Sequence, residues 1–164
     1  KSLGIIANNG LKNEYNFYFK NLNTVGKNDS LYKSSPQMEL MSIFELNTSL
    51  PMINQTENTT NYFTPKASIR FNPGDMKDYS SNERSINVDG IFDINRLAID
   101  DSFEEGKSLT LGLDYKKTKL NDINKFFEAK IATVYRDKNE KFIPKSSGIK
   151  GKDTNVFGTI SNMK

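Results

Sequence analysis

Apolar and polar residues alternate one by one along several segments of this chain, and this pattern constrains the fold more than any other feature. Residues 109–115, with the sequence LTLGLDY, show it most clearly. Successive side chains of a β-strand point to opposite faces of a sheet, so the alternation predicts strands with one apolar and one polar face. No segment carries the spacing of an amphipathic helix, and we therefore expect an all-β chain.

Seven segments meet this criterion. They cover about residues 2–8, 13–23, 37–50, 61–72, 107–116, 126–136 and 154–163. Several reach the length of about ten residues that a tilted strand needs to cross a bilayer. The connections are alternately short and long, as in outer-membrane β-barrels, which have short periplasmic turns and long outside loops. Because the chain begins without Met and ends inside a strand-like segment, we expect an antiparallel transmembrane β-barrel fragment, curved and unclosed.

The composition fits such a barrel better than it fits a soluble domain or a disordered chain. Hydrophobic residues make up 35% of the 164 residues, whereas aromatic residues reach 11%. A barrel reconciles these values because only its lipid-facing side must be apolar. The chain has no Cys and no His, which removes thiolate chemistry and the commonest general base and metal ligand. We therefore expect no enzymatic activity and no cofactor.

Within the predicted barrel, the alternation assigns side chains to the lipid or to the lumen. The residues expected to face lipid are Leu109, Leu111, Leu113, Ala129, Ile131, Ala67 and Ile69. The residues expected to face the lumen are Ser68, Arg70, Thr110, Asp114, Glu128, Lys130 and Arg136. Gly112 falls in the lumen-facing series, where a missing side chain relieves crowding. The lumen set would form a wall of mixed charge, suited to sugars and phosphates.

Two clusters of charge raise the question of a binding site. The acidic cluster consists of Asp100, Asp101, Glu104 and Glu105. Its spacing matches no EF-hand loop and no nucleophile accompanies it, so we favour solvated or salt-bridged carboxylates over a cation site, and both over catalysis. The densest basic group, at residues 116–119, is interpreted as a solvated turn and not as a nucleic-acid surface.

The longest connection, residues 73–106, is polar only in its first part. Residues 86–99 then carry several large apolar side chains. Full burial of even four of them would stabilise by roughly 6–12 kcal/mol, so we expect this segment to fold back against the barrel mouth or a lumen plug. The segment would be strand-like or a short helix, with Arg96 pinning the loop by pairing with Asp101 or a neighbouring carboxylate. The alternative is that residues 86–92 extend the sheet above the membrane.

A more specific pattern lies between residues 65 and 117. The segment PKASIRFNP at 65–73 precedes a polar loop, IFDINRL at 91–97, Asp101, the triplet EEG at 104–106 and the strand LTLGLDY. This order resembles the LPS-assembly outer-membrane protein family LptD, also called the organic solvent tolerance protein family. That family has a Pro-Lys/Arg strand, a loop with Asn-Arg and a later Asp and Gly, and then a strand with a central Gly. The similarity extends over about residues 37–163.

The resemblance implies a section from the C-terminal half of a large barrel in the bacterial outer membrane, with about 26 strands. Residues 1–164 would all belong to this one barrel domain, with the N-terminal periplasmic domain and the lateral seam lying outside them. Such a protein accepts lipopolysaccharide (LPS) from periplasmic bridge proteins and releases it into the outer leaflet. Its implied partners are LPS, the lumen-plugging lipoprotein LptE, the bridge proteins and the lipid bilayer, with no nucleic acid.

Two other classes of function share the physical features of this sequence. A general outer-membrane porin or receptor barrel would show the same alternation and the same sorting of loops. A soluble surface β-sandwich that acts as a binding module would also alternate and lack Cys, but would bury its apolar faces between two sheets. Only the pattern at residues 65–117 favours LPS assembly.

Overall fold

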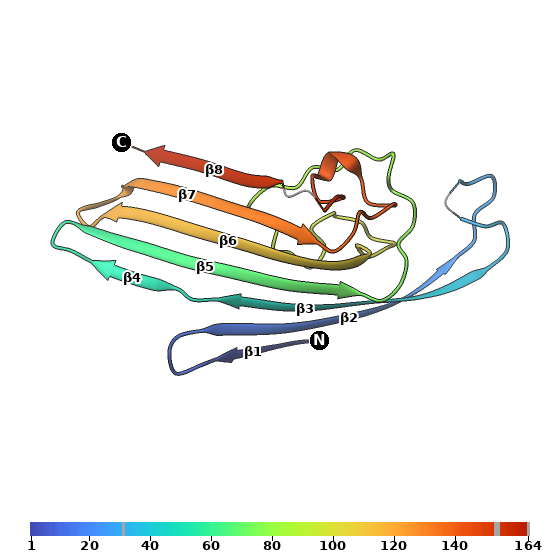
Figure 1. The fold of residues 1–164 in the computed structure, drawn as a ribbon, viewed down its shortest axis with the longest axis horizontal. Helices are drawn as coiled ribbons and strands as arrows, with labels where there is room; N and C mark the ends of the chain where they lie inside the picture. The colour runs from blue at the N-terminus through green and yellow to red at the C-terminus, as the bar shows by residue number, and fades with distance from the viewer. Residues whose placement is uncertain (31, 153–154, 164) are drawn as a thin grey trace.

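The computed structural model describes residues 1–30, 32–152 and 155–163, which form one antiparallel sheet of eight strands. The strands are β1 (Ser2–Ile6), β2 (Lys12–Thr24), β3 (Gln37–Ser49), β4 (Met52–Gln55), β5 (Thr59–Asn72), β6 (Gly106–Lys119), β7 (Asp122–Arg136) and β8 (Val156–Met163). The spatial order is β1-β2-β3-β5-β6-β7-β8, and β4 pairs with β5. Strands β1 and β8 lie at opposite edges, so the sheet is unclosed (Figure 1). The all-β, unclosed prediction is confirmed.

The eighth strand was not expected, because β4 lies inside the predicted connection 51–60. Met52 pairs with Phe63 and Gln55 with Thr60, so this connection is mostly a short hairpin. Pro51 separates β3 from β4 because proline has no N–H for a sheet hydrogen bond. A short 3-10 helix, η1 (Lys145–Ser147), interrupts the connection before β8. Among the described residues, no helix is long and apolar enough to cross a membrane.

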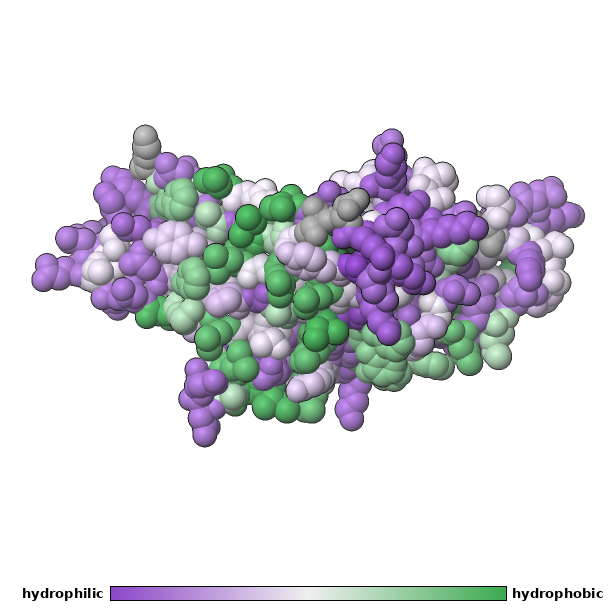
Figure 2. Space-filling view, in the orientation of Figure 1, coloured by the Kyte–Doolittle hydropathy of each residue, from purple (hydrophilic) through white to green (hydrophobic). Residues whose placement is uncertain are grey.

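The cross-strand register sorts the side chains into two faces. Ile69 pairs with Leu109, which pairs with Tyr135, and all three side chains are exposed. Their neighbours Arg70 and Arg136, which flank Ser108, are buried on the other side. We call these the apolar face and the polar face. In Figure 2 hydrophobic surface lies over the strands in the middle of the molecule and hydrophilic surface covers both ends.

The hydrophobic core lies between the long connections and the polar face, not between two sheets. Its buried members are Met76, Tyr79, Val88, Ile91, Leu97, Ile99, Ala132, Val134, Ile143 and Ile149. Two come from β7 and the others from residues 73–105 and 137–155, which we call the first and second capping loops. The single sheet and this one-sided core contradict the two-sheet sandwich alternative. The long connections, including residues 25–30 and 32–36, lie at one end of the sheet and the short turns at the other (Figure 1).

Candidate functional site

Glu104 lies at the centre of a buried ionic cluster where the first capping loop meets the polar face. Its carboxylate accepts a hydrogen bond from Arg96 Nε at 2.6 Å and forms an ion pair with Arg136. Arg70 Nη1 lies 3.6 Å from the same carboxylate, and Arg70 Nη2 forms an ion pair with Glu45. We call these five residues the Glu104 cluster. Its arginines come from the loop, from β5 and from β7, so one carboxylate holds three segments together.

Each arginine of the Glu104 cluster also spans two segments through hydrogen bonds. Arg96 Nη1 donates to Thr110 Oγ1 at 2.9 Å, and Arg96 Nη2 donates to Ser108 Oγ at 3.0 Å. Arg136 donates from Nη1 to the Glu105 carbonyl at 3.1 Å and also to the Ile149 carbonyl. The contacts of Arg96 dock the first capping loop on β6. The contacts of Arg136 join β7 to both capping loops.

The charges of the cluster keep Glu104 ionised. Burial alone would raise the pKa of the Glu104 carboxyl, but the adjacent Arg96 and Arg136 outweigh it and lower the pKa to about 2. A carboxylate with three arginine neighbours in a buried site remains charged throughout the physiological range. Removing it would leave buried positive charges without compensation, which is far more costly than losing an exposed pair.

An aromatic contact docks the first capping loop further along the polar face. The Phe92 ring lies against Gly112 of β6, where an added Cβ would come 2.6 Å from Phe92 Cζ. Lys66 Nζ lies 5.5 Å from the centre of the same ring, and Lys66 forms an ion pair with Asp114. Gly112 therefore provides the space that the loop ring occupies.

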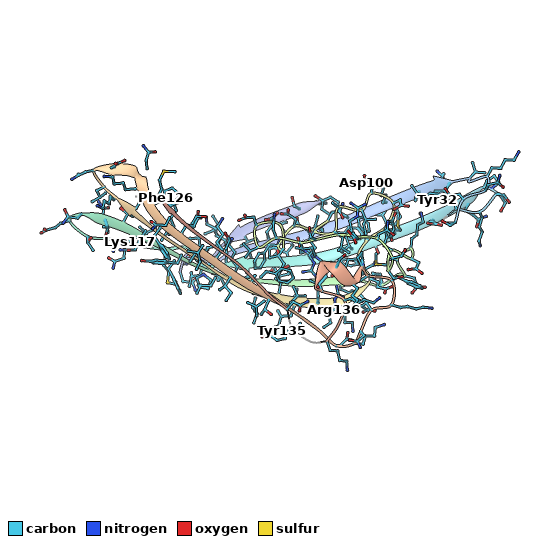
Figure 3. All side chains as sticks on the ribbon, turned by 90° about the horizontal axis from the view of Figure 1, so that it is seen from above. Tyr32, Asp100, Lys117, Phe126, Tyr135 and Arg136 are labelled. Atoms are coloured by element: carbon cyan, nitrogen blue, oxygen red, sulfur yellow. The ribbon has the colours of Figure 1, made fainter. Side chains whose placement is uncertain are left out.

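Asp101 anchors the other side of the first capping loop to the β2–β3 hairpin. It accepts hydrogen bonds from the hydroxyls of Tyr32 and Tyr79, and Lys77 Nζ lies 3.4 Å from its Oδ2. Lys77 Nζ also lies 3.1 Å from Glu39 Oε2 on β3. The hydrogen bond to Asp101 raises the pKa of Tyr32 to about 12, while burial raises the pKa of Tyr79. Tyr32 and Asp100 lie at this end of the molecule in Figure 3.

The candidate lumen residues share the polar face, and the candidate lipid residues share the apolar face. Ser68, Arg70, Thr110 and Arg136 are buried beneath the capping loops. Nearer the short turns, Lys130 Nζ lies 3.4 Å from Glu128 and 2.7 Å from Asp89 of the loop. Asp114 pairs with Lys66 in the same region. The register brings the two predicted sets to opposite faces of the sheet.

The acidic cluster divides between two sets of partners. Glu104 contacts arginines, whereas Asp101 contacts two tyrosines and Lys77. Arg96 was expected to pair with Asp101 or a neighbouring carboxylate, and the structure shows the second of these, with Arg96 paired to Glu104. Within residues 1–30, 32–152 and 155–163, no group of three or more acidic side chains is placed to hold a metal ion.

Residues 86–99 pack against the sheet without becoming a strand or a helix, which corrects that expectation and its alternative of an extended sheet. Asparagine side chains replace regular backbone pairing here. Asn87 Oδ1 accepts from the Gly90 N–H at 2.7 Å, and Asn95 bonds the Ile99 N–H and carbonyl at 3.1 and 3.0 Å. Such local side-chain bonds compete with regular secondary structure.

The second capping loop was missed by the sequence analysis. Ile143 and Ile149 are buried in the core, and the Phe142 N–H donates to Glu105 at 3.1 Å. The signal was the apolar run Phe142-Ile143-Pro144 inside a polar connection, the same criterion that identified residues 86–99. Glu45 was also missed as an ionic partner of Arg70.

Comparison with known proteins gives one match. The family model for LptD, described as LPS transport system D, matches residues 5–162, nearly the whole chain. No curated protein and no solved structure matches.

Proposed function

This chain belongs to the LptD family, LPS transport system D, and from that premise we propose that residues 1–164 form part of the wall of one outer-membrane β-barrel domain. The family transports and assembles LPS at the outer membrane and is not enzymatic. Membership of the LptD family favours LPS assembly over the alternative of a general porin or receptor barrel. The unclosed sheet fits this role, because a barrel closes only with a consistent tilt and stagger around a full ring of strands.

The apolar face has the height that a membrane requires. From Lys107 to Lys117 strand β6 rises about 33 Å, and a tilt of about 40° reduces this to about 25 Å, the height of the apolar band of such barrels. Aromatic rings lie near both ends of this band. At one end the ring centres of Phe44 and Phe71 lie 6.4 Å apart, and at the other end those of Tyr115 and Phe127 lie 6.2 Å apart. Aromatic rings favour the headgroup level of a bilayer.

The polar face then lines the lumen. The lumen set comprises Ser68, Arg70, Thr110, Asp114, Glu128, Lys130 and Arg136, and the capping loops close the lumen at the outer end. The observation that carries this proposal is the Glu104 cluster, because it fixes the apolar segment 86–99 of the first capping loop over the polar face. Arg96 and Asp101 pin the first capping loop at two separate places, on β6 and on the β2–β3 hairpin.

The partners follow from this arrangement. LPS is the transported molecule, and the lipid bilayer surrounds the apolar face. The part of the polar face nearer the short turns, around Asp114 and Glu128, is only half-buried. We assign this part of the wall to contact with the plugging lipoprotein LptE and with LPS arriving from the periplasmic bridge proteins.

Adjacent residues of β7 offer a direct test. A photo-reactive amino acid replaces Lys130, on the polar face, or Ile131, on the apolar face, in the full-length protein in cells. The Lys130 position is expected to crosslink to LptE or to LPS in transit, and the Ile131 position to bilayer lipid alone. Crosslinking of LptE from Ile131 and not from Lys130 would reverse the assignment of the faces.

A further inference from the structure

Lys107 stands on the apolar face where the band of exposed apolar side chains ends. It is paired in the register with Phe71, and its Nζ lies 5.6 Å from the centre of the Phe71 ring. These two residues line a shallow hollow together with Tyr135 of β7 and with Ile69 and Leu109. We call Phe71, Lys107 and Tyr135 the Lys107 patch. It joins a cation, two aromatic rings and an apolar floor on the outside of the sheet.

The ammonium group of Lys107 has no anionic partner in the part of the chain that the structure describes. No carboxylate oxygen of the described residues lies within 4.0 Å of its Nζ, whereas Lys66, Lys77 and Lys130 each form ion pairs. Asp137 borders the same hollow but forms no ion pair with Lys107. Among the residues that the structure describes, Lys107 is therefore a cation without a carboxylate partner, at the boundary between an apolar band and the hydrophilic loops.

We propose that the Lys107 patch binds a phosphorylated sugar headgroup of LPS in the outer leaflet, from outside the barrel and apart from the transport route. The proposal rests on the proposed function, which places the capping loops on the outer side of the membrane. The ammonium group would form a charge-assisted hydrogen bond with a phosphate oxygen. The rings of Phe71 and Tyr135 would lie at headgroup level, and acyl chains would cover Ile69 and Leu109.

The opposite end of the same strand supplies the matched control. Lys117 is exposed, lies on the same face of β6 and is paired in the register with Phe127. Figure 3 shows Lys117 well separated from Tyr135 along the sheet. Lys117 lies at the short-turn end, so the proposed orientation places it beside the inner leaflet and away from LPS.

The test uses the full-length protein in outer membranes whose outer leaflet carries lipid A with two phosphates, or the same lipid A with its phosphates removed, and the protein is extracted with its bound lipid. Binding is measured by native mass spectrometry. Lys107→Gln is expected to weaken binding of the phosphorylated lipid about fivefold, the effect of one lysine near an anionic surface. Lys107→Arg keeps the charge and should keep the binding. Lys117→Gln should leave it unchanged, and the dephosphorylated lipid should not distinguish Lys107→Gln from the parent protein.

Three results would overturn the proposal: no loss with Lys107→Gln, an equal loss with Lys117→Gln, or an equal loss with the dephosphorylated lipid. A loss with Lys117→Gln alone would mean that the chain is inserted the other way round. A negative result at Lys107 can be told apart from a failure of the proposed barrel-wall function. The Lys130 and Ile131 crosslinks report on the faces of the wall, whatever Lys107 binds.

Discussion

Arg96 donates a hydrogen bond from Nε to Glu104 Oε2 at 2.6 Å, and both side chains are buried between the first capping loop and β6. The two residues lie only eight positions apart, yet the pair is completed by arginines from distant strands. A loop held in this way behaves as part of the wall. A substitution that releases the first capping loop should therefore have a measurable effect even when the strands keep their structure.

Glu104→Gln should undock the first capping loop. The substitution keeps the shape of the side chain but removes the carboxylate that contacts Arg70, Arg96 and Arg136 together. Breaking a buried pair on one side costs about 3–5 kcal/mol. Limited proteolysis of the full-length protein should cut residues 73–105 faster in this variant. Asp75→Asn, at an exposed carboxylate of the same loop, is the control and should be cleaved at the rate of the parent protein. Cleavage of Glu104→Gln at the parent rate would contradict the role of the cluster.

The same carboxylate gives a pH dependence of defined sign. The pKa of Glu104 falls from 4.5 to about 2 in the folded state, because the adjacent arginines outweigh burial. A lowered pKa contributes stability above pH 4.5, and that contribution is lost as the pH falls towards 2. The measurement is the urea midpoint of the parent protein minus that of Glu104→Gln. The difference should be constant from pH 7 to 5 and shrink below 4.5; a difference that grows in acid would mean that Glu104 is not ionised by its arginines.

Gly112→Ala should destabilise mainly through a clash with the Phe92 ring. The new Cβ would meet the Phe92 ring at 2.6 Å, which forces the ring or the strand to move. Overpacking of this kind costs about 1–3 kcal/mol. In a Phe92→Ala background the same substitution should cost much less, so a double-mutant cycle measured by urea unfolding should show coupling. Gly4→Ala, where nothing lies within 4 Å of the new Cβ, is the control. Additive effects at Gly112 and Phe92 would contradict the contact.

Arginine substitutions should distinguish the two faces. Ile131 lies on the apolar face opposite Leu113 and Gly158, and Thr159 lies at nearly the same height on the polar face. Ile131→Arg should cost about 2–4 kcal/mol near the middle of the membrane and reduce the assembled protein in the outer membrane. Thr159→Arg should be assembled nearly as well as the parent. Quantitative blotting of folded protein measures both, and equal defects would show that the faces are assigned wrongly.

The sequence was informative wherever period-two alternation met a regular sheet. Ser68 and Ile69 could be assigned to opposite faces without knowing their partners, because neighbouring strands of a sheet share its faces. The structure of the capping loops was harder to predict from the sequence. Burial of residues 86–99 could be predicted from their apolar content, but not their irregular conformation, which depends on Asn87 and Asn95.

The pairing of Arg96 depended on tertiary structure. Asp101 and Glu104 are both within reach of Arg96 along the chain, and only the arrival of Arg136 and Arg70 from the sheet favours Glu104. Asp101 instead meets tyrosines, one of them from the distant connection before β3. Such choices are set by which strands are neighbours, and local spacing carries no signal for them.

The most direct test of a wall capped by its outer loops is single-cysteine labelling on intact cells with a membrane-impermeant thiol reagent. Residues 1–164 contain no cysteine, so each introduced thiol is the single one among them, and labelling of the parent protein gives the background to subtract. Asp100→Cys is exposed on the first capping loop and should label readily, whereas Ile91→Cys, at 0% exposure, should stay protected. Leu120→Cys, in the short turn, should label only after the outer membrane is permeabilised. Ready labelling of Ile91→Cys, or of Leu120→Cys on intact cells, would contradict this arrangement.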